Sequence, residues 1–345
     1  MTSRRVTVLV IDDSAQNRRA ITQLLESAPD VEVIGRASDG EEGLKQAAAL
    51  RPDVITLDLE MPKLDGFAFL RLLMANVPTP VIVISSYAHK SDVFKALELG
   101  AFDFIAKPAR GRDGAEAWRA ELLEKIRAVR LIRPDPRRRD TPQTLRQSST
   151  GRPLLIAAVG ASTGGPPAVQ RLLEALPPDA SICLLVAQHM PPRFTQAFAE
   201  RLDRIGPWTV TEARDGDVPA PGRAFIAPGG KHLLLARGRG GRLELQTPSP
   251  GKGDHYTPSV DLLFRSVAKS LNDQSVGIVL TGMGADGAQG AKAIHQAGGE
   301  VWAESEETAV IFGMPKEAVL TGAVKRILPL HQIPEALAET ARKRQ

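Results

Sequence analysis

Residues 152–177, RPLLIAAVGASTGGPPAVQRLLEALP, contain an apolar run, a glycine-rich turn and an amphipathic helix pattern in direct succession. The apolar run is continuous, which is typical of a strand buried on both faces of a sheet. The prolines after the turn suit the first turn of a helix, and the apolar side chains that follow recur at helical spacing. Such strand–turn–helix units predict a doubly wound, mainly parallel α/β sheet, and we expect an antiparallel hairpin in addition. The helical face comprises Val169, Leu172, Leu173 and Leu176.

The glycine-rich turn at residues 160–164, GASTG, fits the pattern G-x-S-x-G, which places Ser162 at a tight turn with an accessible hydroxyl. A phosphate-binding turn is the alternative for such a segment. Its spacing is not G-x-G-x-x-G, however. The next apolar run, SICLLVAQHM, ends in Gln188 and His189 rather than in the acid that would bind a ribose. The pattern therefore favours a serine nucleophile.

A serine hydroxyl needs a neighbouring base to act as a nucleophile at neutral pH. His189 directly follows the predicted strand that comes after the strand of Ser162, and adjacent strand ends can share one cleft. A capping role at the strand end is the alternative for His189. The weaker candidates are the remaining five histidines, His89, His232, His255, His295 and His331.

A third side chain is needed to orient the imidazole and to offset its developing charge. Residues 275–299, SVGIVLTGMGADGAQGAKAIHQAGG, again indicate a strand, a glycine-rich loop and a helix, with Asp286 in the loop. Asp286 is the candidate, although it is equally well placed to cap the helix that follows it. Backbone N–H groups near the serine could bind an oxyanion. The candidates are Met283 and Gly284 in this loop and Thr163 in the serine turn.

The first part of the chain repeats the alternation of apolar runs and helical patterns over residues 6–107. It predicts a doubly wound, five-stranded parallel sheet of the flavodoxin-like kind. Polar side chains follow the runs, at the sheet edge where ligands bind. These side chains are Asp12, Asp13, Asp58, Ser85, Ser86 and Lys107. Because acids this close repel one another, we expect a hard cation among them, and Mg²⁺ suits an all-oxygen site.

Composition bounds the remaining possibilities. The 345 residues are 43% apolar and 24% charged, as in soluble globular proteins, and are long enough for two domains. We expect domains at residues 1–128 and 153–345, joined by a basic, proline-containing linker at 129–152 that could alternatively bind nucleic acid. The single cysteine, Cys183, excludes a disulfide framework and a CxxC metal site. No apolar run is long enough for a signal-peptide core or a membrane span, so we expect a cytoplasmic protein.

The segments VIDDS, LDLEMPKLDG, SS and KP of residues 5–125 resemble the phospho-acceptor receivers of two-component systems. The resemblance implies that Asp58 accepts a phosphoryl group from a histidine kinase, with Mg²⁺ as cofactor. It further implies that Asp13 and Asp58 bind Mg²⁺ directly, that Asp12 binds it through water, and that Glu60 binds it through its backbone carbonyl. Ser85 and Lys107 would contact the phosphoryl group, and Phe104 would be the aromatic residue that changes rotamer.

The segments GASTGG, QHMP, TPSVDLLF, TGMGADG and FGMPKEA resemble the catalytic domain of protein-glutamate methylesterases of the CheB type, over residues 153–340. The resemblance implies a nucleophile at Ser162, a base at His189 and an orienting acid at Asp286. It implies hydrolysis of glutamate methyl esters on chemoreceptors without a cofactor, and deamidation of receptor glutamines. One departure is DHYT before PSVD, where an arginine is expected.

Together the two resemblances imply an esterase that its receiver blocks until Asp58 is phosphorylated, acting in chemotaxis. The expected partners are chemoreceptors and a chemotaxis kinase. We expect a monomer that neither binds nucleic acid nor inserts into a membrane. Three alternatives stay open: a DNA-binding response regulator, a nucleotide-dependent oxidoreductase, and an inactive adaptor of the same fold.

Overall fold

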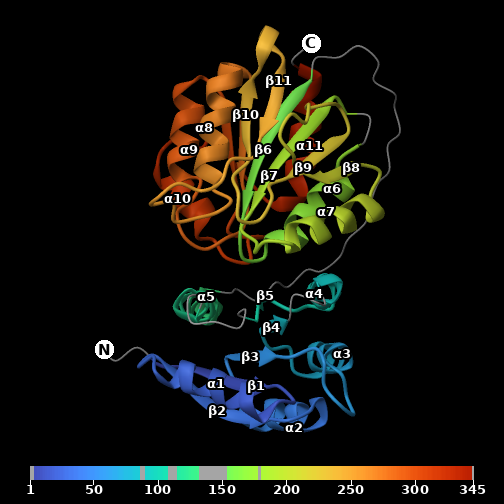
Figure 1. Ribbon diagram of the computed structural model, residues 1–345, viewed down its shortest axis with the longest axis vertical. Coiled ribbons are helices and arrows are strands. Elements are labelled where there is room, and N and C mark those ends of the chain that lie inside the picture. The colour runs from blue at the N-terminus through green and yellow to red at the C-terminus, as the bar shows by residue number, and fades with distance from the viewer. Residues whose placement is uncertain (1–3, 86–89, 108–114, 132–153, 178–179, 344–345) are drawn as a thin grey trace. The chain divides into compact units, whose positions relative to one another are not determined.

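The computed structural model describes residues 4–85, 90–107, 115–131, 154–177 and 180–343 (Figure 1). The chain divides into two compact units between residues 132 and 133. Within the expected linker, Val129–Leu131 form a 3₁₀ turn that directly follows the last helix of the first unit, which ends at Ala128. The rest of that linker lies outside the described residues.

The first unit is a five-stranded parallel sheet with the strand order β2-β1-β3-β4-β5. Its strands are β1 (Val6–Ile11), β2 (Val31–Ala37), β3 (Val54–Leu57), β4 (Val81–Ser85) and β5 (Asp103–Ala106). Its helices are α1 (Ala15–Glu26), α2 (Gly40–Leu50), α3 (Gly66–Asn76), α4 (Lys90–Glu98) and α5 (Ala115–Ala128). This order is the flavodoxin-like one, so the predicted fold of the first unit is confirmed.

The second unit contains a seven-stranded sheet with the order β14-β13-β12-β6-β7-β9-β8, in which every pair is parallel. Its strands are β6 (Leu155–Ala161), β7 (Ile182–Gln188), β8 (Thr209–Glu212), β9 (Arg223–Ile226), β12 (Val276–Val279), β13 (Glu300–Glu304) and β14 (Arg326–Leu328). A separate antiparallel pair, β10 (Leu234–Arg237) and β11 (Leu243–Gln246), matches the expected hairpin.

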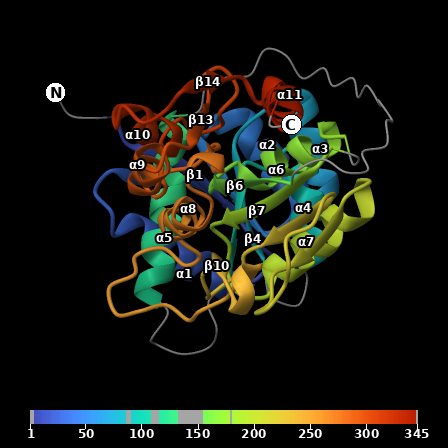
Figure 2. The same cartoon turned by 90° about the horizontal axis from the view of Figure 1, so that it is seen from above.

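Helices cover both faces of this second sheet. They are α6 (Gly165–Ala175), α7 (Phe194–Ile205), α8 (Val260–Leu271), α9 (Ala288–Gln296), α10 (Met314–Leu320) and α11 (Ile333–Lys343). Figures 1 and 2 show α8 and α9 on one side of β6 and β7, and α6 and α7 on the other. The α8–α9 layer packs closely, because a Cβ on Gly277 of β12 would lie 2.5 Å from Ile294 and 3.0 Å from Phe264.

The order of the second sheet places β6 at its centre, with β12 on one side and β7 on the other. The chain first builds outward from β6 through β7 and later returns to add β12, so the strand order reverses beside β6. Ligands of open α/β sheets bind at the carboxyl edge near such a reversal. The loops after β6, β7 and β12 therefore define where to look for a site.

The single cysteine and the apolarity of the helices bear on two expectations from the sequence. Cys183 is fully buried in β7, and burial raises the pKa of its thiol to about 12, so it behaves as a small apolar side chain. Among the helices that the structure describes, none combines the length and the apolarity needed to cross a membrane.

Candidate functional site

The serine turn is held in shape by close packing. Strand β6 ends at Ala161 and α6 begins at Gly165, which leaves Ser162 partly exposed between them. Gly164 adopts a φ of 76°, which favours glycine. A Cβ on Gly165 would lie 2.0 Å from the Oε1 atom of Gln188, so this position also requires glycine. The amide of Gln188 in turn donates to the carbonyl of Ser162 at 2.9 Å.

His189 follows β7 at the same edge of the sheet. Strands β6 and β7 pair Ala161 with Gln188, and the backbone N–H of His189 donates to the carbonyl of Ala161 at 3.0 Å. The Nε2 atom of His189 lies 2.8 Å from the Oδ2 atom of Asp286. Its Nδ1 atom has no hydrogen bond to any described residue, and none joins it to the Ser162 hydroxyl in this conformation.

Asp286 is a buried carboxylate with an unusually full set of donors. Besides His189, it accepts from the N–H of Val260 at 2.7 Å, the N–H of Asp261 at 2.9 Å and the hydroxyl of Ser259 at 3.1 Å. Burial acts to raise its pKa, but the hydrogen bond and charge of His189 and the backbone N–H groups together lower it below the usual value. Asp286 therefore stays ionised at neutral pH.

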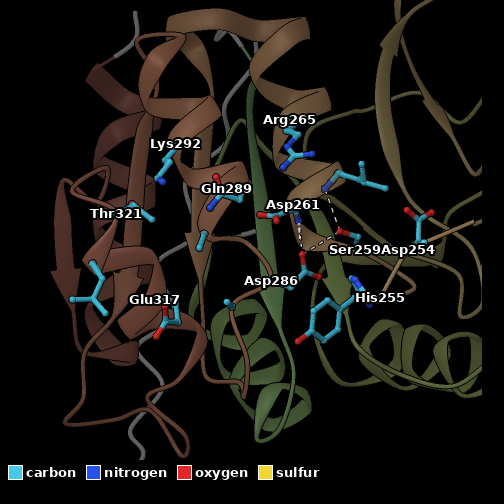
Figure 3. Close-up of a pocket in the computed structure, with 16 residues that line it drawn as sticks. Asp254, His255, Ser259, Asp261, Arg265, Asp286, Gln289, Lys292, Glu317 and Thr321 are labelled. Atoms are coloured by element: carbon cyan, nitrogen blue, oxygen red, sulfur yellow. Dashed lines mark hydrogen bonds between the residues drawn. The ribbon is translucent and has the colours of Figure 1, made fainter. Parts of the chain in front are cut away.

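The alternative that Asp286 caps its own helix is wrong. Helix α9 follows Gly287 without a side-chain cap from Asp286, which instead lies at the start of α8 (Figure 3). The N–H groups of Gly287 and Gly290 at the start of α9 donate to Asp261, at 2.9 and 2.6 Å. Each of the two helices is thus capped by a carboxylate from the start of the other, because their N-termini lie side by side.

A second histidine–aspartate pair lies in the same unit. The Nε2 atom of His232 lies 2.9 Å from the Oδ2 atom of Asp254, and its Nδ1 atom accepts the N–H of Ser259 at 3.2 Å. Because both ring nitrogens are engaged and the side chain is 2% exposed, His232 has no nitrogen left to take a proton from a nucleophile. The remaining described histidines, His255, His295 and His331, are exposed, and His89 lies outside the described residues.

The three oxyanion candidates carry N–H groups that donate to no described protein atom. Thr163 lies in the serine turn, and Met283 and Gly284 lie in the loop after β12. Thr281 joins these segments: its carbonyl accepts the N–H of Ser162 at 3.0 Å, and its hydroxyl donates to the carbonyl of Thr163 at 3.0 Å. The structure thus brings the three donors to one edge of the sheet.

A buried acid behind this loop has no counterpart in the sequence analysis. Glu304, at the end of β13, is fully buried and accepts from the N–H of Thr281 at 2.8 Å and the hydroxyl of Thr308 at 2.9 Å. Burial raises the pKa of Glu304 to about 7. The sequence could have indicated Glu304 only through its position at the end of an apolar run. Its contact with Thr281 could not be predicted, because it depends on β13 lying beside β12 in the sheet.

Tyr256 is a second residue that sequence reasoning missed, although it belongs to the DHYT departure. Its ring stacks on the imidazole of His189 with a centroid separation of 4.8 Å and an interplanar angle of 6°. Nothing in the local pattern could have shown this contact, because the two residues are distant in the chain.

The first unit gathers the predicted acidic residues at its own carboxyl edge. Ligand atoms of Asp12, Asp13 and Asp58 lie within 4.8 Å of one another. The Nζ atom of Lys107 lies 2.5 Å from the Oδ2 atom of Asp58 and 3.5 Å from the Oδ2 atom of Asp12. Burial is the main cause that raises the pKa of Asp12, and the charge of Asp58 adds to it. The Oδ2 atom of Asp12 is buried and accepts no hydrogen bond from a described residue. An all-oxygen cluster with such an atom fits a divalent cation.

The other predicted residues of this cleft surround it. Ser85 ends β4 and is buried, and the N–H of Glu60 donates to Asp58 at 3.4 Å. Phe104 is buried in β5, with its ring edge-on to Phe94 at 6.4 Å. Ser86 lies outside the described residues.

The fold and these two clusters define a two-domain α/β protein that joins a receiver-type acidic cleft to a hydrolase-type grouping of serine, histidine and aspartate. The model of the CheB methylesterase family matches residues 157–337, and that of the response regulator receiver domain matches residues 8–119. The chain belongs to the CheB methylesterase family and carries a receiver domain ahead of the esterase domain.

Similar proteins cover nearly the whole chain. It is 64% identical over 340 residues to a Myxococcus xanthus protein named protein-glutamate methylesterase/protein-glutamine glutaminase 1, with 98% of each chain covered. It is 51% identical to such a protein, numbered 6, from Anaeromyxobacter dehalogenans, with 98% of this chain and 97% of the relative covered. The crystal structure of the Thermotoga maritima CheB methylesterase catalytic domain is 38% identical, with a TM-score of 0.52, and covers 55% of this chain and 99% of that one.

Proposed function

We propose that this chain hydrolyses the 5-O-methyl esters of glutamate side chains on chemoreceptors, releasing methanol, and that it also deamidates receptor glutamines. The observation that carries the proposal is the arrangement of Ser162, His189 and Asp286 at the carboxyl edge beside β6. The names of its relatives support the choice of substrate. The repeated strands and helices of the second unit argue against a DNA-binding output domain.

In the proposed mechanism, the hydroxyl of Ser162 attacks the ester carbonyl while the Nδ1 atom of His189 takes its proton. Asp286 accepts a hydrogen bond from the Nε2–H group of His189 and offsets the charge on the ring. The N–H groups of Met283, Gly284 and Thr163 stabilise the oxyanion. The imidazolium then protonates methoxide, methanol leaves, and a water molecule activated by the same imidazole hydrolyses the acyl-serine to glutamate. No cofactor takes part in this reaction.

The acidic cleft of the first unit is proposed to regulate this activity. Asp58 accepts the phosphoryl group from a chemotaxis histidine kinase. Mg²⁺, when bound, would neutralise charge on that group. The proposed ligands are Asp13 and Asp58 directly, Asp12 through water and Glu60 through its carbonyl. Ser85 and Lys107 contact the phosphoryl group, and Phe104 responds to it by changing rotamer.

Phosphorylation is proposed to relieve inhibition of the esterase by the receiver, in a monomeric cytoplasmic protein. In this proposal the receiver spans residues 1–128, the linker spans residues 129–152, and the esterase domain spans residues 153–345. The protein is proposed to bind no nucleic acid and to insert into no membrane. A fragment from about residue 150 onward should then be active without phosphorylation, and an inactive but folded fragment would instead favour direct activation by the receiver.

The test is methanol release from methylated chemoreceptor membranes with Mg²⁺ and a small phosphodonor, comparing the wild type with Ser162→Ala. We expect release by the wild type and a loss of roughly 10⁴-fold or more in the variant. Release by both proteins would contradict the role of Ser162. No release by either, on receptors from the same organism, would contradict the proposed substrate.

A further inference from the structure

The ring of Tyr256 covers one face of the His189 imidazole. The two rings are nearly parallel, with an interplanar angle of 6° and a centroid separation of 4.8 Å, as in an offset stack. The hydrogen bond to Asp286 fixes the imidazole at a single point in the plane of the ring. That bond alone would allow the ring to tilt about its own axis, whereas a parallel neighbour prevents the tilt.

The same tyrosine also lines a cavity of about 580 Å³ between the starts of α8 and α9 and the loop before α8 (Figure 3). Asp286 lines this cavity as well, but His189 does not. The hydroxyl of Tyr256 lies against Gly284, since a Cβ there would be 2.6 Å from it. Tyr256 thus contacts the imidazole with one ring face and also borders a space that water can fill.

The loop that carries Tyr256 is tied to the buried side chain of His232 at two points. Asp254, ahead of Tyr256, lies 2.9 Å from the Nε2 atom of His232 and also accepts the N–H of Gly251 at 2.7 Å. Ser259, after Tyr256, donates its N–H to the Nδ1 atom of the same ring. These hydrogen bonds fix the loop on both sides of Tyr256, so the loop holds the tyrosine ring in place against His189.

We propose that Tyr256 is a positioning residue that holds the plane of the His189 ring, with its Nδ1 atom toward Ser162, and keeps cavity water from the imidazole. The flat ring does this, and the hydroxyl is dispensable. As a second effect, the aromatic face stabilises the positive charge that His189 acquires when it takes the serine proton. The inference rests on the proposed function, because it assumes that His189 is the base for Ser162.

The experiment measures how fast a small fluorophosphonate labels Ser162 in the full-length chain, together with methanol release from receptors. Labelling needs the serine and its base but no receptor contact, so it distinguishes the inference from the choice of substrate. The variants are Tyr256→Phe, which keeps the ring, and Tyr256→Leu, which removes it. Lys252→Ala is the control, because Lys252 is exposed in the same loop and does not line the cavity.

We expect Tyr256→Phe and Lys252→Ala to label at close to the wild-type rate and Tyr256→Leu to label about tenfold more slowly, with an unchanged unfolding midpoint. On receptors, Tyr256→Leu should lower kcat and leave KM unchanged, which a general loosening of the fold would not do. Asp254→Asn keeps the tyrosine but weakens the tie to His232, and its labelling should slow by a smaller factor.

Wild-type labelling by a folded Tyr256→Leu protein overturns the inference, and so does a Tyr256→Phe protein as slow as Tyr256→Leu, since the hydroxyl would then be responsible. If Tyr256→Leu does not fold, wild-type labelling by Asp254→Asn overturns it instead. Normal Ser162 labelling without methanol release would contradict the substrate alone and leave the inference standing. A wild type that is not labelled at Ser162 would overturn both.

Discussion

Asp12 in the first unit and Asp286 in the second occupy equivalent places, each after a strand at the carboxyl edge of a parallel sheet. They are 1% and 3% exposed, so burial acts on both to nearly the same extent. Yet the pKa of Asp12 is raised, chiefly by burial, whereas that of Asp286 is lowered in spite of burial. The difference lies in their partners. Asp286 accepts from two backbone N–H groups, a hydroxyl and an imidazole, whereas one oxygen of Asp12 accepts no hydrogen bond from a described residue.

The contrast shows that the carboxyl edges of the two sheets suit different chemistry because their carboxylates have different hydrogen-bond partners. A carboxylate saturated by fixed donors keeps its charge and its place, which suits a group that orients a base. A cluster of under-satisfied carboxylates is electrostatically frustrated and so favours the arrival of a cation. The ionised form of Asp12 costs stability in the first unit, where a ligand is to be bound, whereas the fixed donors around Asp286 keep that carboxylate ionised.

The largest expected effect comes from Asp286→Asn. An amide cannot offset the charge on His189, and its NH₂ group would face N–H donors that now meet a carboxylate. We expect kcat for methanol release to fall by about 10⁴-fold. Asp273→Asn, at an exposed position of the same unit, is the control. A decrease smaller than tenfold would show that the saturated carboxylate is only a helix cap.

Glu304 sharpens the comparison, because this buried acid has two donors in the described structure and no ion pair. Its pKa is raised above the unfolded value of 4.5 to about 7. The folded state therefore keeps the proton that the unfolded state loses, and stability falls as pH rises from about 4.5 to 7. We expect this loss to be about 3 kcal/mol.

Denaturant unfolding of the wild type and Glu304→Gln at several pH values measures it. The variant should become more stable relative to the wild type as pH rises through this window, and the exposed-site control Glu307→Gln should not. A stability difference between Glu304→Gln and the wild type that is constant with pH would refute the assignment.

Asp12→Asn tests the frustrated side of the comparison. Since the folded pKa of Asp12 is raised, its ionised form destabilises the metal-free fold at neutral pH. The variant should therefore unfold at a higher temperature without Mg²⁺, while its Mg²⁺ affinity falls roughly tenfold or more. Thermal unfolding and Mg²⁺ titration of the full chain measure the two effects. A variant that loses both stability and affinity would show that Asp12 is an ordinary structural acid.

The smallest effect is expected for Ser259→Ala. Ser259 caps α8 and donates one of the four hydrogen bonds to Asp286. Its loss should cost about 1 kcal/mol of unfolding free energy, with only a few-fold decrease in kcat because the other donors remain. Ser305→Ala, in the loop after β13, is a suitable comparison. A loss of activity as large as that of Asp286→Asn would mean that the four donors act as one unit rather than as separate contacts.

The sequence predicted the local features of this protein well. Continuous runs of Val, Ile and Leu predicted the strands of the first sheet and the central strands β6, β7 and β12 of the second, since burial on both faces leaves a one-dimensional signature. The shorter strands β8, β9, β13 and β14 carry no such run and were not predicted. The glycines around Ser162 predicted a tight turn, and the structure shows close contacts that require them. Positions after successive parallel strands predicted that Asp12, Asp58 and Lys107 would meet, because that consequence follows from topology alone.

Tertiary structure decided which partners the polar side chains take. Among the described residues, two histidine–aspartate pairs form in one unit. Only the three-dimensional arrangement shows that both nitrogens of His232 are hydrogen-bonded, while Nδ1 of His189 has no hydrogen bond to a described residue. Tyr256 reaches His189, and Asp286 caps α8 rather than the adjoining α9. The sequence cannot specify such contacts locally, because hydrogen bonds and ring stacks depend on distances between segments far apart in the chain, whereas periodicity records only which face of its own strand or helix is buried.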